Sequence, residues 1–116
     1  MRVTASKFVS ELKALGQLPK QYTVKIEFYS QFWRKTVRIK RNYALVQVTD
    51  GELVVTVVYD SLRKLLETLK TAEVDVAVTA NELHIAYPVG KVNLIHIDGF
   101  EDLPMVELRT MAHVSE

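Results

Sequence analysis

An internal duplication constrains the fold of this chain more than any other feature of its sequence. Val3 to Leu15 reads VTASKFVSELKAL, and Val57 to Leu69 reads VVYDSLRKLLETL at a constant offset of 54 residues. Each copy has the pattern of a short strand that leads into a helix and is followed by alternating strand segments, which predicts a β-α-β-β-β unit that occurs twice. The matching apolar positions are Phe8 with Leu62, Leu12 with Leu66, and Leu15 with Leu69.

The duplication predicts a single domain of the α+β class. The two halves are expected at about residues 1–53 and 54–108, related by a pseudo-twofold axis, with residues 109–116 as a C-terminal tail. Each predicted helix carries one apolar stripe, so both need a common core. We therefore expect the two helices to lie side by side on one face of antiparallel sheets.

Start and stop signals delimit two amphipathic helices. The first is predicted from about Ser6 to Leu15, with Ser6 as its N-cap and Gly16 as a stop signal. The second is predicted from about Ser61 to Lys70, with Asp60 as its cap. The apolar stripes are Phe8, Leu12 and Leu15 in the first helix and Leu62, Leu65, Leu66 and Leu69 in the second.

Alternating apolar residues predict most of the strands. Turn signals such as Asp50-Gly51 and Asp98-Gly99 separate them. Leu53 to Val58 is apolar with little alternation, as expected of a strand that is covered on both faces. The alternating segments are Tyr22 to Tyr29, Thr36 to Lys40, Tyr43 to Thr49, Val74 to Thr79, Leu83 to Tyr87 and Lys91 to Ile97.

The formal charge of +1 conceals an asymmetry between the halves. Residues 1–56 contain ten Lys or Arg against four Asp or Glu, whereas residues 57–116 contain five against ten, which gives +6 and −5. Either the surface charges are unevenly placed without a role, or the basic side meets an anion or the acidic side of a neighbouring copy.

Cationic residues give the clearest functional signal. Trp33 to Arg41 reads WRKTVRIKR, with five cations and no acid. Phe32 and Trp33 beside them suit stacking on bases, although a basic strand equally protects a sheet edge from aggregation. The solvent faces of both helices add spaced cations, which suit phosphates contacted without sequence preference. The candidate DNA-binding residues are Lys7, Lys13, Arg63, Lys64 and Lys70 on the helices and Arg34, Arg38 and Lys40 on the basic strand.

The sequence lacks the known signatures of catalysis and of cofactor binding. It contains no phosphate-binding loop, no dinucleotide fingerprint and no nucleophile elbow. No cysteine is present, which excludes a disulfide framework and a thiolate zinc site and suits a cytoplasmic protein. The longest apolar segment, Leu53 to Tyr59, is too short to span a bilayer. We expect a cytoplasmic protein that is not an enzyme, with no catalytic residue, no metal and no cofactor.

Histidines and one acidic cluster are the remaining candidates for chemistry. His84, His96 and His113 are too dispersed for a convincing metal site and are interpreted as surface or hydrogen-bonding residues. The loop acids, which are Asp98, Glu101 and Asp102, are interpreted as a solvated turn rather than a magnesium site.

The order of motifs from Val57 to Pro104 matches a known pattern. A strand leads into a helix of the form L-x-x-L-L-x-x-L, followed by a V-x-V-x-V strand, a turn at Asn81, an L-x-I strand and an acidic-aromatic-Pro sequence. This order resembles the repeating domain of bacterial sliding clamps, the beta subunit of the replicative DNA polymerase. The residues in these places are Leu62, Leu65, Leu66, Leu69, Val74, Val76, Val78, Asn81, Leu83, Ile85, Phe100, Glu101, Asp102 and Pro104.

The resemblance implies a processivity factor that contacts duplex DNA through its helix cations and tethers a DNA polymerase or another replication protein. A bacterial clamp subunit has three such domains, whereas this chain has the length of one. The resemblance therefore implies a homo-oligomer built by head-to-tail contact of edge strands. The resemblance to sliding clamps implies no DNA-binding role for the basic strand at Arg34 to Arg41.

Two other functions remain open. One is a stand-alone nucleic-acid-binding or regulatory module that keeps the clamp fold, forms no ring and uses the basic strand. The other is a protein-interaction domain that adds a partner strand to an exposed sheet edge.

Overall fold

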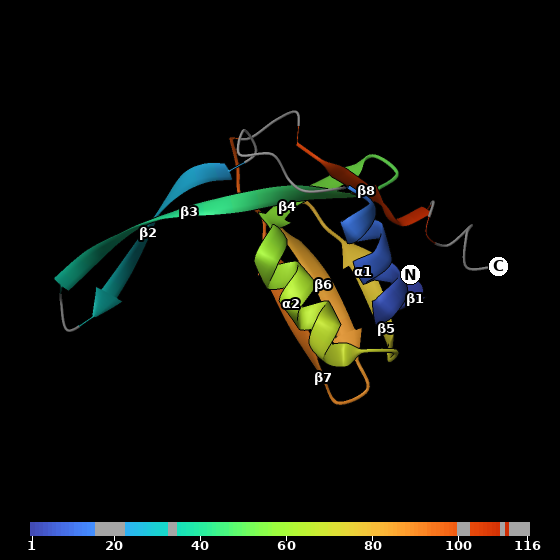
Figure 1. Ribbon diagram of the computed structural model, residues 1–116. Helices are drawn as coiled ribbons and strands as arrows, with labels where there is room; N and C mark the ends of the chain where they lie inside the picture. The colour runs from blue at the N-terminus through green and yellow to red at the C-terminus, as the bar shows by residue number, and fades with distance from the viewer. Residues whose placement is uncertain (16–22, 33–34, 100–102, 110, 112–116) are drawn as a thin grey trace.

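Two helices lie side by side against two β-sheets, and a two-stranded arm extends away from this body (Figure 1). The computed structural model describes residues 1–15, 23–32, 35–99, 103–109 and 111, with backbone only for 23–32 and 35–42. The architecture is α+β, as predicted. In chain order the elements are β1 (Arg2–Thr4), α1 (Ala5–Ala14), β2 (Thr23–Phe32), β3 (Lys35–Asp50), β4 (Leu53–Val58), α2 (Tyr59–Leu69), β5 (Glu73–Val78), β6 (Glu82–Tyr87), β7 (Gly90–Ile95) and β8 (Met105–Glu107).

Both predicted helices are present, but each begins one or two residues earlier than predicted. The predicted caps Ser6 and Asp60 are wrong, because both residues already lie inside their helices. Thr4 and Val58 hold the N-cap positions with extended backbones and without a side-chain cap hydrogen bond. In each half a strand runs directly into a helix, so no turn residue is needed to start it.

The described strands form two sheets that pair the halves differently. One sheet has the order β1-β5-β6-β7, and the other has the order β2-β3-β4 with β8 parallel to β3. β1, the first strand of the first half, pairs with β5, the strand after α2. A twofold axis would likewise pair β4, the first strand of the second half, with β2, the strand after α1, but β4 pairs with β3. The predicted twofold symmetry therefore fails in the strand pairing. Gly51, with a φ of 66°, turns the chain so tightly that β4 folds back on the strand before it.

β3 is one strand of 16 residues, so the prediction of separate strands at 36–40 and 43–49 is wrong. Arg41 and Asn42 continue the ladder opposite Ile26 and Lys25 instead of forming a turn. Neither residue has the backbone freedom of glycine or the restriction of proline that would end a strand. The first half consequently has one strand fewer than the β-α-β-β-β unit.

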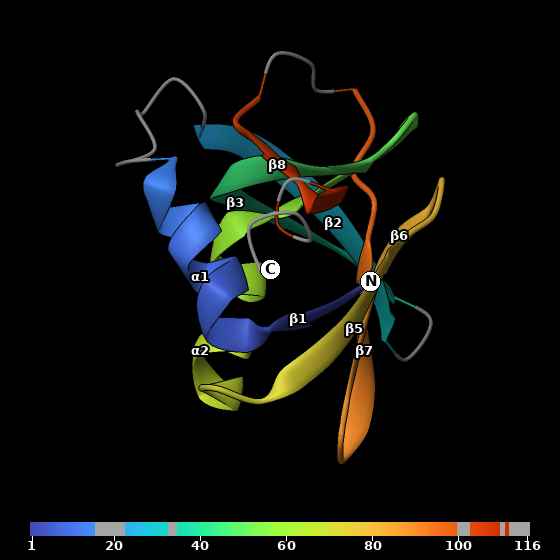
Figure 2. The same cartoon turned by 90° about the vertical axis from the view of Figure 1, so that its right-hand side faces the viewer.

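A hydrophobic core fills the space between the helices and the two sheets. Figure 2 shows both helices on one side of the molecule, with strands of the two sheets above and below. Val55, Thr56 and Val57 are consecutive buried residues, which confirms that β4 is covered on both faces there. The helices contribute the fully buried residues Phe8, Leu12, Leu62 and Leu66, while Leu15, Leu65 and Leu69 pack partly buried against them.

The end of the chain contributes to this core. β8 was not predicted, and it aligns with β3 from Gln47↔Met105 to Thr49↔Glu107. Leu108 and Met111 follow it and are fully buried in the core. The expected tail from residue 109 is therefore wrong at Met111, because this apolar side chain closes the core.

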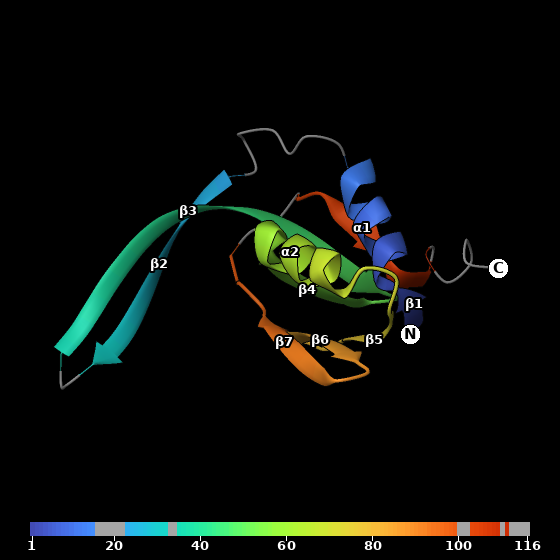
Figure 3. The same cartoon turned by 60° about the horizontal axis from the view of Figure 1, so that its bottom comes forward.

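β2 and the outer part of β3 form an arm, which comprises residues 23–32 and 35–44. Its register is unbroken from Thr23↔Ala44 to Phe32↔Lys35. Among the described strands β2 pairs only with β3, and Figures 1 and 3 show the arm extending away from the body. The molecule is accordingly elongated, with extents of 51 × 33 × 25 Å.

His96 fastens the segment after β7 to the edge of β4. Its Nδ1 accepts a hydrogen bond from the backbone N–H of Thr56 at 2.9 Å, and its Nε2 lies 2.8 Å from Oδ1 of Asp98. Because Nδ1 is the acceptor, Nε2 carries the proton and donates to the carboxylate. The expectation that His96 is a hydrogen-bonding residue is confirmed.

Replacing His96 with alanine should lower the free energy of unfolding by about 1 to 3 kcal/mol, because the Thr56 N–H would lose its acceptor in a buried position. Thr56 is only 1% exposed, so water replaces the imidazole poorly. Urea denaturation measures the loss, with His84→Ala on β6 as the control. A loss at His96→Ala no greater than at His84→Ala would contradict this role.

Candidate nucleic-acid interface

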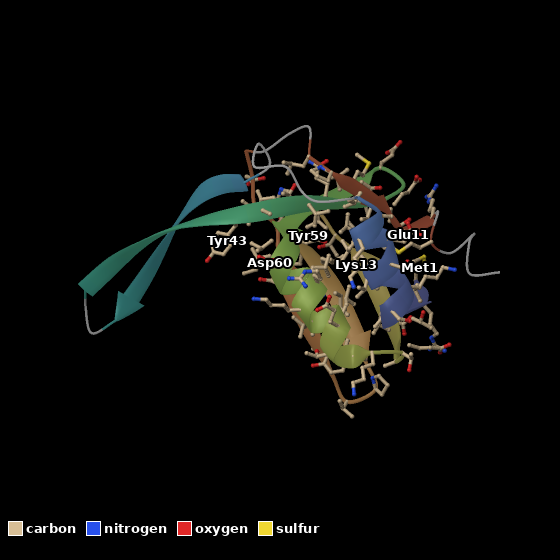
Figure 4. The ribbon with its side chains drawn as sticks, viewed as in Figure 1. Met1, Glu11, Lys13, Tyr43, Tyr59 and Asp60 are labelled. Carbon is tan, nitrogen blue, oxygen red and sulfur yellow. The ribbon has the colours of Figure 1, made fainter. Side chains whose placement is uncertain are left out.

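An open groove of about 460 Å³ lies between the two helices. Lys13 and Lys70 line it with amines, and several hydroxyl groups accompany them. Figure 4 shows Lys13 on α1 where that helix faces α2. We call this surface the helix groove, and its lining residues are Ser6, Val9, Ser10 and Lys13 from α1 and Leu66, Glu67, Lys70 and Thr71 from α2 and the residues that follow it.

Acidic side chains neutralise part of the helix surface. Glu67 lies 3.9 Å from Nζ of Lys13 and 3.2 Å from Nη1 of Arg63, and Nη2 of Arg63 lies 3.3 Å from Oδ1 of Asp60. Hydrogen bonds to the carboxylates of Asp60 and Glu67 raise the pKa of Arg63 above its ordinary value. The guanidinium is therefore charged but already engaged. Such exposed pairs add little stability, so their main effect is to lower the positive potential here.

The helix groove unites only two of the five predicted helix cations, Lys13 and Lys70. Arg63 lies on the same helix as Glu67 but is held by its two acidic partners. Lys7 and Lys64 lie on parts of the helix surfaces that do not line the groove. Among the described residues, Lys7, Lys64 and Lys70 have no ionic partner, which leaves their charges available to a ligand.

Lys70 ends α2 in a backbone conformation that glycine adopts more readily. Its φ is 55°, the only positive φ of a non-glycine residue in the described part of the chain. A conformation of this kind costs on the order of 1 to 3 kcal/mol and often occurs at functional sites. It places a lysine at the groove, which is also lined by Ser6, Ser10 and Thr71, whose hydroxyls are able to donate hydrogen bonds to phosphate oxygens.

The basic strand lies on the arm and not beside the helices. Arg34 lies outside the described residues, while Arg38 and Lys40 belong to β3. Residues of a strand alternate between its two faces, so Arg38 and Lys40 share a row with Val46 and Val48. Those two valines are buried in the core with the helices. Arg38 and Lys40 thus continue the helix-facing row of β3 beyond the body, whereas Lys35 and Arg41 lie on the opposite face.

Sequence reasoning missed two features of this surface. The groove hydroxyls belong to common surface residues and carry no signal in the sequence. The Arg63–Glu67 pair has the favourable spacing of four residues and could have been found, whereas the Lys13–Glu67 contact joins two helices and requires their packing.

Other candidate chemistry is weak in the described part of the chain. No group of three or more His, Asp or Glu residues there is placed to hold a metal ion. Of the acidic loop cluster, Asp98 pairs with His96, while Glu101 and Asp102 lie outside the described residues. No helix in the described ranges is long and apolar enough to cross a membrane.

Comparison with known proteins identifies no relative: no family model, no curated protein and no solved structure matches the chain. The resemblance to sliding clamps therefore stays a prediction.

Proposed function

We propose that this protein is a non-enzymatic DNA-binding factor that contacts the phosphate backbone of duplex DNA through the helix groove. The observation that supports this proposal is that two lysines and three residues with hydroxyl groups line one open groove. Amines and hydroxyls bind phosphate oxygens without reading base sequence. As the resemblance to sliding clamps implies, the bound protein then tethers another protein, such as a DNA polymerase, to the DNA.

The arrangement of charges favours a long polyanion over a small phosphate compound. Small ligands are held in concave sites that bury most of their surface, whereas the helix groove is open. Lys7 and Lys64 extend the positive surface over both helices and outside the groove. A duplex presents phosphates at regular intervals and can use separated cations of this kind.

The Lys13→Glu/Lys70→Glu variant should bind a labelled duplex much more weakly than the unaltered protein. Each lost phosphate contact reduces the slope of log affinity against log salt by roughly 0.9, so the double variant should lose about two units of slope. Fluorescence anisotropy titrations at several salt concentrations measure both quantities. The control is Lys91→Glu/Arg109→Glu, which changes the net charge equally at exposed residues away from the groove. Equal losses in the two double variants would contradict a specific role of the groove.

The arm supports a second candidate function, a stand-alone module that binds nucleic acid without forming a ring. Its register places Lys25, Arg38 and Lys40 on one face of a projecting ribbon. In that case Arg38→Glu/Lys40→Glu should abolish duplex binding, and Lys13→Glu/Lys70→Glu should have little effect. The two candidates thus predict opposite results with the same variants.

A further inference from the structure

The register of the arm gathers most of its apolar residues on one face, while both faces carry cations. Directly paired residues of an antiparallel ladder share a face, and faces alternate along each strand. Phe28 is opposite Ile39 on one face, whereas Glu27 is opposite Lys40 on the other. By this register the face that we call the apolar face holds Val24, Ile26, Phe28, Phe32, Val37, Ile39 and Tyr43, together with Ser30, Lys35 and Arg41.

An isolated ribbon of this kind needs a partner. A two-stranded hairpin is marginally stable in water by itself, and unpaired strand edges attract other chains. Among the described strands nothing pairs with the outer edge of β2, or with β3 along residues 35–42 on the side away from β2. Figure 3 shows the arm reaching away from the helices and from the β1-β5-β6-β7 sheet of its own chain. Its apolar face is therefore an interaction surface.

The positive charge of the arm indicates an acidic partner. A second copy of this chain offers an acidic surface of this kind. Residues 23–32 and 35–44 contain five Lys or Arg against one Glu, a formal charge of +4. Residues 73–98, which include β5, β6 and β7, contain one Lys against four Asp or Glu, a formal charge of −3. β1 adds Arg2 to this sheet, where Arg2 pairs with Asp75, so the four-stranded sheet keeps a formal charge of −2. Its charge is opposite to that of the arm, which favours contact between the arm of one copy and this sheet of another.

β7 offers the apolar surface that such a contact needs. It is the outer strand of its sheet within the described residues, and Ile95 on it is 75% exposed. A groove of about 520 Å³ runs beside it, which we call the β7 groove. Six of the residues that line it are Val58, Asn93, Leu94, Ile95, His96 and Ile97.

We propose that two copies of this chain exchange arms, each packing the apolar face of its arm on the β7 groove of the other. Val58 in the β7 groove pairs with Leu45, directly beyond the arm, so the arm begins beside the groove of its own chain. A twofold rotation then brings both arms onto both grooves at once and closes the assembly. A head-to-tail contact of edge strands, the arrangement expected from the sequence, would leave an arm free at one end of an open assembly and a groove free at the other.

Disulfide cross-linking tests this contact without background from native cysteines, because the chain contains none. Full-length Ile39→Cys protein is mixed with differently tagged Ile95→Cys protein under mild oxidation. The mixed disulfide should form at least tenfold faster than with Ser10→Cys protein, whose cysteine lies in the helix groove. A pair of residues 39 and 95 that cross-links no faster than the pair of residues 39 and 10 would overturn the proposal.

Sedimentation gives a second test on the intact protein. The unaltered chain should sediment as a dimer, and Ile95→Glu should raise the dissociation constant about tenfold or more, because it places a charge in the apolar contact. Val89→Glu is the control, since Val89 is 90% exposed in the turn before β7 and outside the groove. Circular dichroism verifies that both variants stay folded. A chain that is monomeric at every concentration, or a dimer that Ile95→Glu leaves intact, would refute the arm exchange.

Discussion

Replacing Leu66 with alanine should lower the free energy of unfolding by about 2 to 5 kcal/mol, because the deleted side chain leaves a cavity that its neighbours fill only in part. Leu66 is fully buried in the core that α2 shares with α1 and both sheets. Urea denaturation followed by circular dichroism measures the loss.

Lys64→Ala is the matched control, since Lys64 is an exposed residue of the same helix. Its effect should stay within about 0.5 kcal/mol. If Leu66→Ala cost less than that, the apolar stripe of α2 would not face the core, and the packing of the two helices described above would be wrong.

Raising the salt concentration from about 50 to about 200 mM should weaken duplex binding roughly a hundredfold. The reason is counterion release: four lysine contacts give a slope near −3.6 in log affinity against log salt. The four lysines are Lys7, Lys13, Lys64 and Lys70. Arg63 is excluded because Asp60 and Glu67 bind it at 3.3 and 3.2 Å, whereas Lys13 has only the longer contact of 3.9 Å with Glu67. Anisotropy titrations at constant pH provide the slope.

Two duplexes of equal length and unrelated sequence serve as the internal control for this measurement. Both should bind with the same affinity and the same slope, because backbone contacts carry no sequence information. An affinity that is independent of salt, or that differs strongly between the two sequences, would show that the helix lysines are not the main contacts.

The helices and the second-half strands could be predicted because their periodicity is strong. Leu62 and Leu66 are four residues apart on one face of a helix, and both are fully buried. β5 alternates exposed and buried residues without exception, as its sequence EVDVAV indicates. In such elements the residues that the sequence pattern predicts as buried are the ones buried in the fold, so the pattern alone is enough to predict the element.

The arm and the C-terminal strand could not be predicted in the same way. The polar residues Arg41 and Asn42 interrupt the apolar alternation, yet their pairing with β2 keeps β3 continuous. β8 has three residues and pairs in parallel with a strand more than fifty positions earlier in the chain. The continuity of β3 and the formation of β8 both depend on pairing with strands elsewhere in the chain. The short segments themselves do not specify that pairing.

The candidate site was predictable in its residue types but not in its geometry. The sequence identified Lys13 and Lys70 as helix cations, and the structure places both at one groove. It could not show that Glu67 contacts Lys13 across the helix pair. It also could not show that Arg38 lies on a projecting arm, apart from the helices.

An NMR titration of the labelled protein with duplex DNA at low salt tests the proposed helix-groove interface most directly. The amide signals of residues 6–13 and 67–71, which form the two walls of the helix groove, should shift progressively as duplex is added. Amides of β6, none of whose residues lines the helix groove, should stay in place. Binding that leaves the signals of residues 6–13 and 67–71 unchanged, or no binding at all, would contradict the proposal that the helix groove holds DNA.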